Sequence, residues 1–104
     1  MGQYKDLYLI IGVKNDIEKS KNTFINELYI EIKNKYGIIE LSKLFYISIK
    51  ECYNKLSILI VWIQRHSQKI IQQCIKNMNN YEILGESGIL RKLKAKIIKI
   101  KKYS

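Results

Sequence analysis

The order in which two hydrophobic periodicities follow each other constrains the fold of this chain more than any other feature. Near the start, "YKDLYLIIGV" (residues 4–13) carries apolar residues at every second position, which is the spacing of a β-strand. From residue 22 to residue 37, Phe24, Leu28 and Ile32 instead recur one helical turn apart, and the segment ends at a glycine. We therefore expect a strand followed by a helix.

The same succession of periodicities occurs again further along the chain. Residues 44–52 and 56–65 both alternate, and the "YNK" between them suits a turn, so two antiparallel strands are expected. Residues 66–80 return to helical spacing and end in an asparagine pair. "YEIL" (residues 81–84) then predicts a short last strand.

This order of elements predicts an α+β fold. A β-α-β-β-α-β succession is the split-βαβ, ferredoxin-like sandwich, which the RNA-recognition fold shares, with two helices on one face of a four-stranded antiparallel sheet. The chain has 104 residues, of which 47% are hydrophobic, and it has no internal repeat or Pro/Gly/Ser-rich linker. A single domain over residues 1–104 is therefore expected.

The C-terminal stretch "LGESGILRKLKAKIIKIKK" (residues 84–102) adds a basic element. Seven of its last twelve residues are Lys or Arg, and no acid follows Glu86. Leu93, Ile97 and Ile100 fall on one stripe of a helix, so an added basic C-terminal helix is expected. A strand stays open as an alternative, because the same segment also alternates.

The charge of the chain is concentrated in its second half. The formal net charge is +10; residues 1–52 hold eight basic and seven acidic groups, whereas residues 53–104 hold eleven and two. A/T-biased coding would also enrich Lys, Ile, Asn and Tyr, but it does not explain why the acids disappear from one half. The second half is therefore the expected contact for a polyanion.

Other chemistry has little support in the residues. The single His66, and Cys52 and Cys74 without a CxxC motif, indicate neither a zinc site nor a disulfide, which suits a reducing compartment. Glu27 and Glu31 lie one turn apart on a lysine-rich helix, which is typical of a solvated face. We expect no catalysis by the chain alone, no bound cofactor, no signal peptide and no membrane span.

The stretch that contains Gly85 to Gly88 suggests how an anion would be held. A strand, a tight Gly-x-Ser-Gly loop and a helix can present main-chain N–H groups to a phosphate. The basic side chains beyond it would follow a nucleic-acid backbone without reading bases. The aromatic motif of the RNA-recognition fold is absent, so Trp62 is expected to pack against the core or a partner, and stacking on a base is the less favoured alternative. An amphipathic tail on anionic lipid remains an alternative.

Four blocks of the sequence carry a resemblance to a known family. "YLIIGV", "YGIIELSKLFYISI", "ILIVWIQR" and above all "LGESGILRK" occur in an order and spacing similar to those of the Pop-five protein subunit of ribonuclease P and its relative ribonuclease MRP. The similarity covers nearly the whole chain. The chain departs from the family at Ile89, where Thr is usual, and at Trp62, where a further Arg is usual.

The resemblance implies an accessory role rather than an active site. In the family, the RNA subunit uses Mg²⁺ to release the 5′ leader of precursor tRNA, and the small basic protein braces that RNA. The implied partners are the ribonuclease P RNA or the MRP RNA, a TIM-barrel-like protein subunit, which would meet apolar strand surfaces that no helix covers, and other ribonuclease P proteins. Precursor tRNA would be the holoenzyme's substrate, in the nucleus and nucleolus of a eukaryote, or otherwise in the cytoplasm.

Pattern and resemblance together predict the residues that hold RNA phosphates, and two other functions stay open. One is a free-standing RNA-binding module of another ribonucleoprotein, and the other is a protein of anionic membrane surfaces. The predicted phosphate-binding residues are Arg65, Ser87, Gly88, Arg91, Lys92, Lys94, Lys96 and Lys99.

Overall fold

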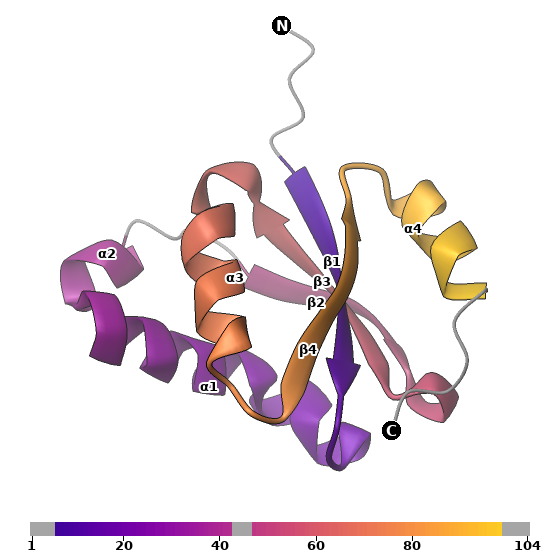
Figure 1. Cartoon of the computed structure of the whole chain (residues 1–104), viewed down its shortest axis with the longest axis horizontal. Helices are drawn as coiled ribbons and strands as arrows, with labels where there is room; N and C mark the ends of the chain where they lie inside the picture. Colours follow the sequence, from indigo (N-terminus) through magenta and orange to yellow (C-terminus); the bar gives the residue numbers. More distant parts are fainter. Residues whose placement is uncertain (1–5, 43–46, 99–104) are drawn as a thin grey trace, which may run out of the picture.

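The computed structural model describes residues 6–42 and 47–98 as an α+β sandwich around one antiparallel sheet, with strand order β2-β3-β1-β4. Helices α1 and α3 lie on one face of the sheet and α4 lies on the other (Figure 1). The elements are β1 (Asp6–Val13), α1 (Ile17–Tyr36), α2 (Ile38–Ser42), β2 (Ile47–Tyr53), the 3₁₀ turn η1 (Asn54–Leu56), β3 (Ile58–Gln64), the 3₁₀ turn η2 (Arg65–Ser67), α3 (Gln68–Lys76), β4 (Tyr81–Ser87) and α4 (Leu90–Ile98).

The predicted ferredoxin-like order is confirmed, and so is the added C-terminal helix, because residues 90–98 are helical and not a strand. None of the described helices is long and apolar enough to cross a membrane.

Helix α1 begins five residues earlier than the apolar spacing predicted. Its N-cap is Asp16, whose side chain accepts a hydrogen bond from the main-chain N–H of Glu18 at 3.0 Å. The predicted start near Asn22 was wrong because the added turns are mostly polar and only Ile17 and Ser20 of them are buried. A capping signal, rather than hydrophobic periodicity, sets where this helix starts.

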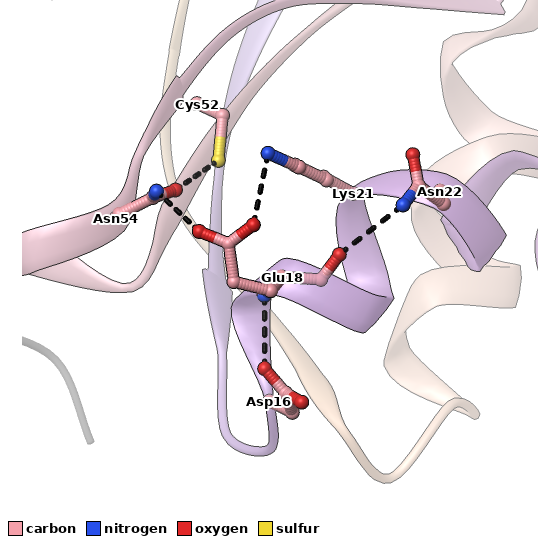
Figure 2. A network of polar contacts seen from close by, with 6 residues as sticks. All are labelled: Asp16, Glu18, Lys21, Asn22, Cys52 and Asn54. Carbon is pink, nitrogen blue, oxygen red and sulfur yellow. Dashed lines mark hydrogen bonds and ion pairs between the residues drawn. The ribbon is translucent and has the colours of Figure 1, made fainter.

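A polar network ties the start of α1 to the turn between β2 and β3 (Figure 2). Glu18 accepts a hydrogen bond from the side-chain amide of Asn54 and forms an ion pair with Lys21 at 3.0 Å. The Cys52 thiol donates to the Asn54 side-chain oxygen at 3.0 Å. The carboxylate of Glu18 raises the pKa of Lys21. These groups use one another as partners, so we interpret the network as structural.

The main core lies between the sheet and helices α1 and α3. Phe24 of α1 meets Tyr81 of β4 edge to face, with 4.8 Å between the ring centroids. Burial raises the pKa of Tyr81 to about 12, and its hydroxyl donates to Glu27 at 2.7 Å. The inward residues of all four strands take part, and the members with the least exposure are Leu7, Leu9, Ile11, Val13, Phe24, Leu28, Ile32, Leu59, Val61, Ile63, Ile71, Cys74 and Ile75.

A second core lies on the other face, beneath α4. Leu93 and Ile97 are 0% and 4% exposed and pack on Ile10, Ile58 and Ile60 at the centre of the sheet. The apolar strand surface that was expected to meet a protein partner is therefore largely covered by the chain itself. The described large apolar side chains that remain exposed lie instead on α1 and α2, and they are Ile30, Ile38 and Ile39.

Docking of α4 gives a direct test of stability. Replacement of Leu93 by Ala should lower the free energy of unfolding by about 2–5 kcal/mol, because it leaves a cavity under the helix. Replacement of the exposed Lys92 by Ala should change it by less than about 0.5 kcal/mol. Urea denaturation measures both, and equal effects of the two substitutions would show that α4 is not held on the sheet.

Candidate nucleic-acid interface

Helix α4 keeps its cations outside the apolar stripe that it buries on the sheet. Its apolar stripe is buried, whereas all four of its basic residues are exposed. By helical spacing Arg91 lies opposite the stripe, Lys92 and Lys96 share one flank, and Lys94 occupies the other. Burial of the stripe therefore fixes the direction in which each cation points.

Lys94 is used to attach α4 to the sheet. Its ammonium lies 2.6 Å from a carboxylate oxygen of Glu51 in β2, and the Tyr53 hydroxyl donates to the other oxygen. The hydrogen bond from Lys94, followed by that from Tyr53, holds the pKa of Glu51 below its usual 4.5. The charge of Lys94 is therefore matched within the protein, which reduces what this predicted RNA contact can offer a phosphate.

Lys96 and the last acid of the chain are arranged differently. The Glu86 carboxylate accepts hydrogen bonds from the side-chain amides of Gln68, at 3.2 Å, and Gln72, at 2.7 Å, both on α3. Lys96 donates to the main-chain oxygen of Glu86 at 3.2 Å. Because a carbonyl does not neutralise an ammonium and the carboxylate faces α3, Glu86 does not form an ion pair with Lys96.

Two β-bulges determine on which face of the sheet Glu51 and Glu86 lie. In β2 a register shift after Ile49 makes Glu51 the neighbour of Ile60, on the α4 face. In β4 a shift makes Glu86 the neighbour of Leu9, on the α1 and α3 face. A regular ladder would reverse both placements, because one residue of register exchanges the faces. The bulges thus bring a carboxylate to Lys94 and take one away from the rest of α4.

The connection between β4 and α4 is shorter than predicted. Strand β4 continues through Ser87, and Gly85 pairs with Ile10 inside the sheet, so the expected Gly-x-Ser-Gly loop was wrong. Only Gly88 and Ile89 lie between the strand and the helix. The Ser87 hydroxyl accepts from the main-chain N–H of Ile89 at 3.1 Å, which removes one donor from the expected phosphate cradle.

Arg65 reaches the same end of the sheet as the start of α4. It follows β3, whose last residue Gln64 pairs with Asp6, and β4 ends where Ser87 pairs with Tyr8. The antiparallel register therefore places the ends of β3 and β4 on either side of the start of β1. Lys99 lies outside the described residues.

The structure leaves an uncompensated cationic surface on α4, which we call the basic surface and define as Arg91, Lys92 and Lys96. In the part of the chain described here, none of the three forms an ion pair with a carboxylate. Of the predicted residues, Lys94 is ion-paired, Ser87 ends β4, Gly88 begins the connection to α4, and Arg65 lies at the same end of the sheet. The sequence pattern missed Glu51, because its position depends on the bulge in β2.

Groups that suggest catalysis or metal binding are scarce in the residues that the structure describes. No cluster of three His, Cys, Asp or Glu side chains occurs there. Cys52 and Cys74 are free thiols, and burial raises the pKa of both, which disfavours the reactive thiolate. A polar pocket of about 390 Å³ lies between the start of α1 and that of β4, at the opposite end of the sheet from the first turn of α4.

Comparison with models of known protein families and with curated proteins finds no match to this chain. The likeness to the Pop-five family therefore rests on the four sequence blocks themselves.

The Lys94–Glu51 pair predicts a pH-dependent stabilisation of α4. The pKa of Glu51 is lowered in the folded state, so the pair contributes above pH 4.5 and is lost as pH falls through the folded value. A double-mutant cycle with Glu51→Gln and Lys94→Met should give a coupling of roughly 0.2–1 kcal/mol near neutral pH, the range of exposed pairs. The coupling should fall as the pH is lowered through the folded pKa of Glu51, and a coupling that stays unchanged in acid would contradict the assignment.

Proposed function

We propose that this protein is a non-catalytic RNA-binding subunit of a ribonucleoprotein, and that the ribonucleoprotein is ribonuclease P. The observation that carries RNA binding is the basic surface on α4, which is directed outward by a buried apolar stripe and, among the described residues, forms no ion pair with a carboxylate. A cationic helix packed on a sheet in this way suits a phosphate backbone.

The contacts expected at the basic surface are phosphate contacts and not base contacts. Arg91 can hold two oxygens of one phosphate in its guanidinium fork, while Lys92 and Lys96 act as point charges. Such contacts position a protein on RNA and carry no sequence information. Selectivity for one RNA would then come from its folded shape.

The assignment to ribonuclease P is supported by the sequence block "LGESGILRK", which forms the end of β4, the two-residue connection and the first turn of α4. In this proposal the RNA performs the Mg²⁺-dependent cleavage, and the protein braces it beside a TIM-barrel-like subunit. The ribonuclease MRP RNA would be held by the same surface. Membrane attachment through α4 has weaker support, because Leu93 and Ile97 are buried on the sheet.

Charge reversal tests this proposal in the protein's own cells. A tagged Arg91→Glu/Lys92→Glu variant should lose its RNA, because two phosphate contacts become repulsive. The matched control is Lys33→Glu/Lys35→Glu, which makes the same change of charge on exposed residues of α1. Sequencing of the co-purified RNA and an assay of 5′-leader removal from precursor tRNA give the readouts.

Wild-type protein and control should each retain one structured RNA with leader-removal activity. Recovery of a single RNA without that activity would place the protein in another ribonucleoprotein. Diffuse RNA in every sample, or equal recovery by both variants, would overturn the proposal.

Salt dependence gives a second, independent check in vitro. Replacement of Arg91 and Lys92 by Ala should make the slope of log K against log salt shallower by roughly one to two, since about one counterion is released per phosphate contact. Titration of the recovered RNA at several salt concentrations measures the slope. The double alanine variant of Lys33 and Lys35 should keep the wild-type slope, and a loss there of the same size would mean that binding is diffuse.

A further inference from the structure

The two central strands place an aromatic pair on the face of the sheet that carries α4. Tyr8 of β1 is the register partner of Trp62 of β3. Ser87 of β4 flanks Tyr8, and Ser48 of β2 flanks Trp62, so the four residues form one row across the sheet. We call this row the aromatic row.

Helix α4 covers the neighbouring rows more fully than it covers this one. Ile10, Ile58 and Ile60 are at most 1% exposed beneath the helix, whereas Tyr8 and Trp62 are each only partly buried. Tyr8 packs at the border of the core beneath α4. Cross-strand partners on one face have Cβ atoms about 4.5–5.5 Å apart, which allows two rings to form a continuous surface.

The Trp62 ring already has a cation placed over it. The Lys50 ammonium lies 5.7 Å from the ring centroid, and Lys50 is an exposed residue on β2. A flexible exposed side chain therefore occupies the position over the ring, which a ligand can take by displacing it. An exposed cation–π contact corresponds to only about a two- to fivefold effect on an equilibrium, whereas stacking one base on an aromatic ring corresponds to roughly 5- to 150-fold.

We propose that Tyr8 and Trp62 form a stacking platform for unpaired bases of the bound RNA. Lys50 would then move from the ring to a phosphate of the same strand. The aromatic row continues to Ser87, which directly precedes the connection to α4. An RNA strand whose phosphates bind the basic surface can therefore stack its bases on the row. The inference rests on the proposed RNA-binding function and adds to it single-stranded RNA as the ligand class.

The sequence pattern favoured packing for Trp62 because it was the only aromatic residue of its strand. Its partner is supplied by a different strand, and only the register brings them together. The platform does not follow from the likeness to the Pop-five family either, because that family usually has Arg at the position of Trp62.

The test compares two strands that carry the same phosphates. One is an oligouridylate of about 12 nucleotides, and the other is an abasic strand of the same length. Trp62 is the only tryptophan, so its fluorescence reports stacking directly. The oligouridylate should bind at least about fivefold more tightly than the abasic strand and should quench this fluorescence.

Variants identify the residues responsible. Trp62→Leu and Tyr8→Leu should each remove most of the preference for bases and leave binding of the abasic strand unchanged. Tyr36→Leu is the matched control and should keep the preference, because Tyr36 packs on the other face of the sheet, which α1 and α3 cover. Tyr8→Leu retains the fluorescent reporter, so it decides the matter should Trp62→Leu fail to fold by circular dichroism.

The outcomes separate this inference from the function on which it rests. Equal affinity of the wild-type protein for both strands, without quenching, would overturn the platform and leave phosphate binding intact. Binding of neither strand at low salt would overturn both. If the preference for bases persists in both leucine variants, another part of the protein contacts the bases, and the platform is overturned.

Discussion

The packing of α4 on the sheet is the contact on which the rest of the structure depends. The central strands β1 and β3 carry apolar residues on both faces, so helices α1 and α3 bury only half of their hydrophobic surface. Leu93 and Ile97 supply the cover that Ile10, Ile58 and Ile60 need on the second face. Without that cover, the sheet would expose a contiguous apolar patch, which soluble domains rarely do.

The same contact determines the electrostatics. A helix that must bury one stripe has no freedom to turn its cations elsewhere, and the acids around it are placed by strand register. The bulge in β2 brings Glu51 to Lys94, where the pair pins the flank of α4 to the sheet. The bulge in β4 sends the carboxylate of Glu86 to the amides of α3. Two single-residue insertions in the ladder thus determine which cations stay available.

The sequence allowed the fold to be predicted because its periodicities are strong and their order is restrictive. The order of the four strands and of the two helices packed between them follows from apolar spacing alone, whereas the spacing of the tail suited a helix or a strand. The start of α1 does not, since Asp16 and the polar turn after it carry no periodic signal. The extent of β4 was missed because Gly85 is read as a loop residue until its pairing with Ile10 is known. In the candidate site, the sequence allowed the cations to be predicted. The acids and carbonyls that they contact could not be predicted, because their positions depend on strand register.

Helix α4 covers the row of Tyr8 and Trp62 less fully than it covers the neighbouring rows of the sheet. Two residues join β4 to α4, which covers the rows of Ile10 and Gly12. The row of Tyr8 and Trp62 ends at Ser87 and so lies near the first turn of α4. The same short connection thus sets how near the basic surface lies to the aromatic row. A surface that combines phosphate contacts with sequence-tolerant stacking favours single-stranded or unpaired segments over regular duplex. The protein would then distinguish RNAs by where a folded RNA presents an unpaired segment next to a row of backbone phosphates.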